Sequence, residues 1–196
     1  MSGRLSAPLA AVALGLTFGA LGAFGQAQLD RTLEAFPNSI STWLLAPFLV
    51  GAVAAGRGQA AVAGAVTCAF QLAGYYAVNV LQDIGTTASL VVFWTACAVV
   101  GGPVFGAAGR LWRVGEPGRR ELGVAVLAGV FVAEGAYAFL LQERRYVAGV
   151  LWIAIGATLA LVAGRGRLDG LRWLGLTVPL GIAGEVALTS VLSRVF

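Results

Sequence analysis

Seven apolar segments, separated by short polar connectors, constrain the fold of this 196-residue chain more than any other feature. Each segment is close to the ~20 residues that a helix needs to cross the hydrocarbon core of a bilayer. Because backbone N–H and C=O groups find no water there, such segments are expected to be helical. We therefore predict an all-α fold, a polytopic transmembrane helical bundle that forms one transmembrane domain over residues 1–196. The predicted spans are 8–25, 38–56, 60–81, 86–111, 121–141, 147–163 and 173–193.

Composition supports this class and narrows the chemistry. The chain is 59% hydrophobic and 11% charged, whereas soluble domains are about 25% charged. It contains no histidine, and all 13 basic residues are arginine. A histidine-bound metal or haem, a nucleophile paired with histidine and a Schiff-base lysine are therefore excluded. We predict no metal and no cofactor. The net charge of +4 reflects loop arginines beside a membrane and does not indicate nucleic-acid binding.

The loop arginines predict the orientation of the chain in an inner (plasma) membrane. If the N-terminus is cytoplasmic, the inner connectors hold Arg4, Arg57, Arg110, Arg113, Arg119, Arg120, Arg165, Arg167 and Arg172. The outer connectors then hold only Arg31, Arg144, Arg145 and Arg194. The positive-inside rule therefore predicts that the N-terminus is inside and the C-terminus outside, as an odd number of spans requires. In the first outer connector, Ser39, Ser41 or Thr42 is expected to cap the second helix.

Two carboxylates, Glu134 and Glu185, lie within predicted spans. A charge at that depth costs about 3 kcal/mol, so each should face a protein interior or a watery cavity. Counted from the cytoplasmic ends of their helices at about 1.5 Å per residue, both lie roughly 18–20 Å from the inner face. Two facing carboxylates in a dry cavity cannot both ionise easily, which would leave one acid able to donate a proton. The alternative is that either acid is a hydrogen-bonded structural element.

Other polar and aromatic residues are predicted at a similar depth. Gln71 falls near the midplane, and Tyr75 and Asn79 lie further out on the same helix. Phe131 and Tyr137 are three residues from Glu134, and Thr189 is four residues from Glu185. We predict a pocket that opens toward the outer leaflet and binds a hydrophobic small molecule. Its predicted lining is Gln71, Tyr75, Asn79, Trp94, Phe131, Tyr137 and Thr189. Each of Phe131, Trp94 and Tyr75 taken alone is more typical of a core or lipid-facing position than of ligand binding.

The chain resembles the small integral-membrane terpene cyclases of fungi and actinobacteria, which are seven-helix proteins of similar size with buried acids. The resemblance rests on size, span number and the two intramembrane acids, Glu134 and Glu185. It implies a class II-type, protonation-initiated cyclisation of a lipid-like isoprenoid, in which aromatic faces stabilise the carbocation. The stretches Asn38–Trp43 and Gly102–Gly106 also look like those of an actinobacterial multi-pass membrane family, and that likeness implies no activity.

A small transporter or substrate-capture subunit is the alternative function. In that case Glu134 and Glu185 would bind a cation or relay protons. Capture subunits of vitamin transporters are similarly small but usually have six spans. The first three and last three segments show no internal repeat, so the sequence does not support an inverted-repeat transporter. The oligomeric state does not follow from the sequence.

Overall fold

The computed structural model describes residues 3–29, 34–163 and 167–195, and every regular element within them is a helix. Arg31 and Arg165, two of the arginines used to predict orientation, lie outside the described residues. The chain forms two compact units, Met1–Val114 and Gly115–Phe196. The division falls within the basic connector between the fourth and fifth predicted spans.

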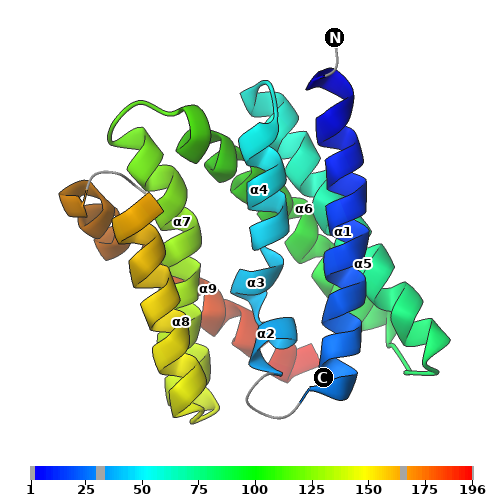
Figure 1. The fold of residues 1–196 in the computed structure, drawn as a ribbon. Helices are drawn as coiled ribbons and strands as arrows, with labels where there is room; N and C mark the ends of the chain where they lie inside the picture. Colours follow the sequence, from blue (N-terminus) through cyan, green and yellow to red (C-terminus); the bar gives the residue numbers. More distant parts are fainter. Residues whose placement is uncertain (1–2, 30–33, 164–166, 196) are drawn as a thin grey trace. The chain divides into compact units, whose positions relative to one another are not determined.

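In the first unit, three long helices carry most of the packing: α1 (Gly3–Gln28), α5 (Arg57–Leu81) and α6 (Ala88–Val114). A Cβ atom at Gly15 would lie 2.6 Å from the carbonyl oxygen of Thr67, and one at Gly19 would meet the carbonyl of Gln71. These contacts advance together along both helices, so α1 and α5 run in the same direction (Figure 1). Small residues permit this close approach.

The segment predicted as the second span is broken into α2 (Ala35–Asn38), α3 (Ile40–Trp43) and α4 (Leu45–Val53). The first break is at Ser39, which is extended with φ −80° and ψ 129°. Its hydroxyl oxygen accepts a hydrogen bond from the backbone N–H of Thr42 at 3.3 Å. Ser39 is thus one of the three capping residues expected from sequence, although it caps the short α3. The apolar helical part, Ile40–Val53, is shorter than a full span.

Glycines set the contact of α6 with α4 and α5. A Cβ at Gly64 of α5 would meet the carbonyl oxygen of Gly102, and one at Gly51 of α4 would meet that of Gly106. A Cβ at Gly106 would meet the carbonyl of Ala60 on α5. Gly106 therefore lies against both neighbouring backbones, where no larger residue fits.

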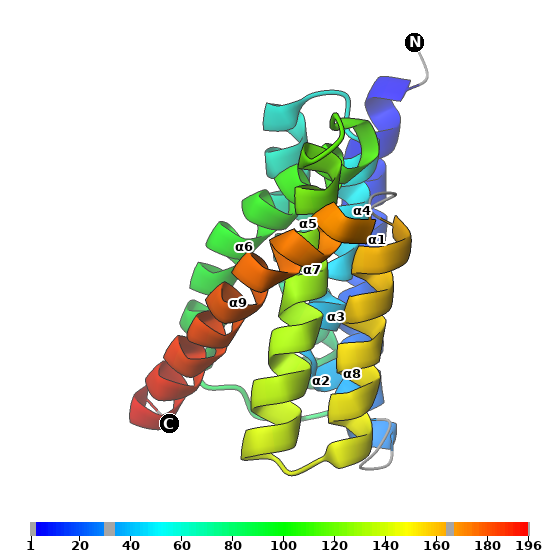
Figure 2. The same cartoon turned by 90° about the vertical axis from the view of Figure 1, so that its left-hand side faces the viewer.

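The second unit consists of α7 (Arg119–Glu134), the π-helix η1 (Gly135–Gln142), α8 (Tyr146–Thr158), the π-helix η2 (Leu159–Ala163) and α9 (Arg167–Val195). Gly135 lies against Gly149 and Trp152 of α8, and Trp152 is fully buried. On another side of α7, Gly129 contacts Thr177 of α9. Figure 2 shows α9 crossing α7 obliquely. Helices α8 and α9 thus both pack closely against glycines, Gly135 of η1 and Gly129 of α7.

Six helices among the described residues are long and apolar enough to cross a membrane. They are Ala7–Gln26, Arg57–Leu81, Ala88–Val114, Arg119–Gln142, Tyr146–Ala163 and Asp169–Arg194. Six of the seven predicted spans coincide with them, and the remaining one, 38–56, is the broken segment α2–α4. The prediction of an all-helical fold is confirmed for the described residues, and six of the helices are long and apolar enough to cross a membrane. The prediction was based on the length and apolar composition of the segments, and the helices observed have both properties.

Candidate functional site

Glu134 and Glu185 both lie in the second unit, and both are buried. Their side chains are 3% and 7% exposed. Among residues 171–194 of α9, Glu185 is the only one that is buried, while leucines and valines around it are exposed. An apolar helix that exposes its hydrocarbon and buries its carboxylate presents that carboxylate to protein and not to lipid. This matches the expectation from the cost of an intramembrane charge.

Helix packing directs Glu185 toward α7. Thr177, Gly181 and Glu185 are four residues apart and so share one stripe of α9. Thr177 contacts Gly129, and Gly181 lies 2.7 Å from the Cβ of Ala133, measured from a Cβ placed on the glycine. The two helices therefore run in the same direction, as predicted. Beyond this contact the stripe of α9 continues to Glu185, and α7 ends at Glu134. Glu134 and Glu185 interact electrostatically.

Glu134 is the last residue of α7, and the π-helix η1 begins at the next residue. A π-helical segment inserts extra backbone into a turn and frequently occurs at functional sites. The change of helix type shifts every side chain after Gly135 relative to the α-helical register. As a result, the sequence spacing of three between Glu134 and Tyr137 does not place the two side chains on one face as an α-helix would.

An aromatic cluster lies on the side of α7 and η1 that faces α8. The rings of Phe131 and Trp152 are 6.4 Å apart, and those of Phe139 and Trp152 are 5.1 Å apart in an edge-to-face arrangement. All three side chains are buried. Phe131 is thus brought into the same unit as the acids, as part of this cluster. Sequence analysis missed Phe139 and Trp152, although the spacing of eight between Phe131 and Phe139 is a signal for one helical face.

The other two residues predicted in this unit are less enclosed. Tyr137 is half-buried, and its hydroxyl oxygen accepts a hydrogen bond from Nε2 of Gln142 at 2.8 Å. Thr189 is exposed on α9, one turn beyond Glu185. The second unit therefore contains Glu134, Glu185, Phe131 and Tyr137, of which the two acids interact, whereas Thr189 lies exposed on α9.

The first unit holds a separate polar network around the broken segment. The hydroxyl of Tyr75 donates to Oε1 of Gln26 at 2.6 Å, and Nε2 of Gln26 donates to the carbonyl of Pro37 at 3.3 Å. Nε1 of Trp43 donates to the same carbonyl at 2.9 Å. The almost fully buried Gln71 donates from Nε2 to the carbonyl of Trp43 at 2.9 Å. These side chains supply partners for backbone carbonyls that the breaks in the helix release.

Two of the four residues predicted in the first unit, Gln71 and Tyr75, belong to this network. Asn79 is 6% exposed, and its backbone carbonyl accepts from the N–H of Ile84 at 2.9 Å. The half-buried Trp94 lies against Phe93 with ring centroids 5.1 Å apart. Sequence analysis missed Gln26 and Trp43 because their partner, Pro37, becomes a hydrogen-bond acceptor only through the break. The predicted pocket draws on residues of both units and stays a prediction.

Removing one hydroxyl tests the importance of this network. We expect Tyr75→Phe to destabilise the folded protein by about 1–2 kcal/mol, because it leaves the partly buried amide of Gln26 with one partner fewer. Tyr76→Phe is the matched control, since its ring packs on Tyr75 with centroids 5.4 Å apart and no hydrogen bond of its hydroxyl is found among the described residues. Thermal unfolding in detergent should separate the two variants. Equal midpoints would show that the network is dispensable.

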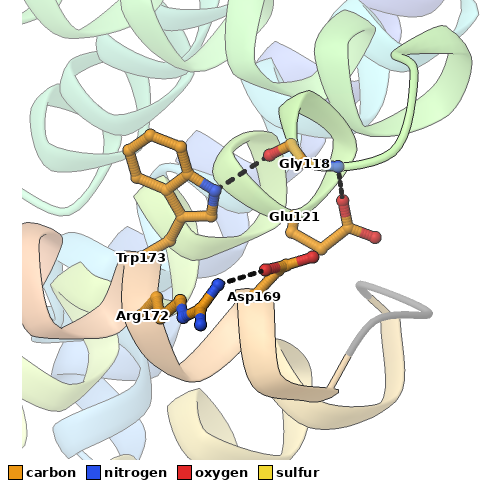
Figure 3. Close-up of polar contacts among 5 residues, drawn as sticks. All are labelled: Gly118, Glu121, Asp169, Arg172 and Trp173. Carbon is orange, nitrogen blue, oxygen red and sulfur yellow. Dashed lines mark hydrogen bonds and ion pairs between the residues drawn. The ribbon is translucent and has the colours of Figure 1, made fainter.

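A polar contact ties the start of α9 to the start of α7 (Figure 3). Nε1 of Trp173 donates to the carbonyl of Gly118 at 2.9 Å, and the N–H of Gly118 donates to the buried carboxylate of Glu121 at 2.5 Å. Gly118 has φ +84°, a conformation that favours glycine. Asp169 and Arg172 form an exposed ion pair at 3.4 Å beside it. The contact of Trp173 fixes the register of the two helices that carry Glu134 and Glu185.

The six apolar helices and the two acids buried within them define the class of this chain, a multi-pass helical membrane protein. It belongs to the family of unknown function DUF6518, which it matches over residues 2–194. The match includes both units and both acids. Comparison with curated proteins and with solved structures gave no match.

Proposed function

We propose that this protein is a membrane-embedded enzyme that cyclises a lipid-like isoprenoid, with Glu134 and Glu185 as its acid–base pair. The observation that carries the proposal is the placement of Glu185, the one buried residue among 171–194 of an apolar helix whose other residues in this range are half-buried or exposed. A carboxylate kept at that depth has a cost that lipid packing does not offset. Chemistry on an apolar substrate within the membrane gives a reason for keeping it.

The reaction needs only groups that this chain contains. A proton from one carboxylic acid adds to a terminal alkene carbon, which leaves a carbocation on its neighbour. A second alkene of the same substrate attacks that cation, and a new carbon–carbon bond closes the ring. Loss of a proton to the partner carboxylate forms the product alkene, so the product is an isomer of the substrate. Aromatic faces in this unit, such as that of Phe131, would favour the cation.

We also propose seven membrane crossings with the N-terminus in the cytoplasm of an inner (plasma) membrane. Helices α1 and α5 run in the same direction, so the chain between them has to return across the unit. The broken segment α2–α4 would make that crossing, its freed carbonyls being bonded by Gln71, Gln26 and Trp43. Broken helices are tolerated in a membrane where protein surrounds them.

The test is a product assay with matched variants. Membranes containing the protein are incubated with prenyl substrates of several chain lengths, and isomeric cyclic products are identified by mass spectrometry. We expect Glu134→Gln and Glu185→Gln each to lower product formation by at least 100-fold, because general acid–base groups contribute about 10²–10⁴-fold. The control is Glu116→Gln, which removes an exposed carboxylate outside both acids' helices. If no prenyl substrate gives an isomeric product, the cyclase proposal is wrong.

The broken segment favours one second candidate, a small transporter or substrate-capture subunit. Discontinuous membrane helices commonly form substrate and ion sites in transporters, because their ends leave backbone groups unbonded. Here the polar network already bonds several of those groups, which is why we place this function second. It predicts stabilisation of the protein by a cation, lost in Glu134→Gln and Glu185→Gln, and no isomeric product in the same assay.

A further inference from the structure

We propose that the first unit binds one anionic phospholipid in an open apolar hollow. The hollow lies between the N-terminal half of α1 and the C-terminal ends of α4 and α6. The hollow has a volume of about 440 Å³, within the range of about 300–1,000 Å³ typical of small-molecule sites. Three helices form it: Ala10 and Leu14 of α1, Leu49 and Val53 of α4, and Trp112 and Arg113 of α6. All residues that line it belong to the first unit, whereas the two acids belong to the second.

The wall of the hollow suits an acyl chain. Leu49 and Val53 are exposed on α4 and offer hydrocarbon along its length. Trp112 is held in place by Phe48, with ring centroids 5.4 Å apart. Tryptophan prefers the boundary between hydrocarbon and headgroups, because its ring is apolar and its N–H is polar. The hollow therefore extends from an apolar wall to a position typical of the headgroup layer.

Charge determines which headgroup fits. Arg113 lines the hollow and is exposed. Arg110, one turn earlier, donates to the carbonyl of Ala55 at 2.9 Å, which ties the end of α6 to the turn before α5. Arg57 is exposed two residues after Ala55. Three guanidinium groups thus gather at this end, and none of the ion pairs among the described residues involves them.

The described acidic residues of this unit lie at its other end. Of those that the structure describes, Glu34 precedes α2 and Asp83 follows α5, 26 positions after Arg57 at the opposite end of the 25-residue α5. Within the first unit, the end that carries the hollow therefore holds arginines and none of the described carboxylates; Glu116, three residues after Arg113, belongs to the connector that begins the second unit. Basic pockets between membrane helices bind anionic headgroups, and each arginine near the surface contributes about 1 kcal/mol. A phosphodiester with a net negative charge is favoured over a zwitterionic headgroup.

The experiment uses the full chain in mild detergent. Phosphatidylglycerol and phosphatidylcholine with identical acyl chains are titrated, and the bound lipid is counted by native mass spectrometry. We expect one phosphatidylglycerol per chain, bound at least fivefold more tightly than phosphatidylcholine. Arg113→Gln should weaken phosphatidylglycerol about fivefold, the equivalent of about 1 kcal/mol, and leave phosphatidylcholine unchanged. Ala10→Phe, which fills the hollow, should weaken both lipids.

The matched control is Arg119→Gln, which removes the same charge from an exposed position of the second unit, outside the hollow. It should retain the affinity of the unmodified protein for phosphatidylglycerol. Equal affinity for the two lipids would overturn the proposal, and so would an equal loss in Arg119→Gln and Arg113→Gln. Arg113 is exposed, so its substitution tests the proposal even if Ala10→Phe does not fold.

Discussion

Gly106→Ala is expected to destabilise the protein by about 2–3 kcal/mol, although it adds a single methyl group. A Cβ at this position would meet the carbonyl oxygen of Ala60 and lie 3.1 Å from the Cα of Gly64. Both neighbours are backbone atoms of α5, so no side-chain rotation can relieve the contact. Either the helices separate or the backbone shifts, and overpacking of this kind typically costs 1–3 kcal/mol.

Gly101→Ala on the same helix is the matched control. Its Cβ would lie 3.7 Å from Cδ2 of Leu44, an ordinary contact with the end of a side chain. Because alanine is a better helix former than glycine, this variant should be unchanged or slightly more stable. Unfolding in mixed micelles measures both variants. Similar losses for the two would show that the glycines of α6 matter for their backbone and not for packing against α5.

Much of the fold follows from the sequence because a bilayer permits few structures. The lengths of the apolar segments predicted the six long helices closely. A single segment in a bilayer can form all its backbone hydrogen bonds internally only as a helix. The break in α2–α4 was beyond such reasoning. Ser39 was expected to cap a helix, but the breaks in this segment are accommodated because Gln26, Trp43 and Gln71 bond the freed carbonyls. Gln26 and Gln71 come from α1 and α5, outside the broken segment, whereas Trp43 lies within it.

The candidate site shows the same limit. The burial of Glu134 and Glu185 follows from the cost of an intramembrane charge, and the shared direction of their helices follows from counting spans. Their mutual register depends on how Gly129 and Gly181 seat α9 on α7. The π-helix that begins after Glu134 also has no simple sequence signal. Counting residues from the helix ends therefore predicted a depth for each acid but could not predict their mutual register.

Glu185→Leu is expected to remove activity while leaving the protein as stable as before, or more so. Leucine is similar to glutamate in size and helix propensity, and its apolar side chain suits the apolar helix α9 that carries Glu185. The substitution also removes a carboxylate that interacts electrostatically with Glu134. Replacing buried charged groups with apolar ones is often neutral or stabilising by 1–4 kcal/mol. A gain of roughly 1–3 kcal/mol in the free energy of unfolding, together with loss of product formation, would identify Glu185 as a residue kept for function at the expense of stability.

The central claim, that Glu185 serves chemistry and not folding, is tested most directly by the unfolding free energy of Glu185→Leu in mixed micelles. Val186→Leu, at the exposed neighbouring position, is the matched control and should leave stability nearly unchanged. We expect the Glu185→Leu variant to unfold at the same free energy as the unmodified protein or at a higher one. A loss of 2 kcal/mol or more, on the order expected when a buried hydrogen-bonded group loses its partners, would contradict it and identify Glu185 as a structural element.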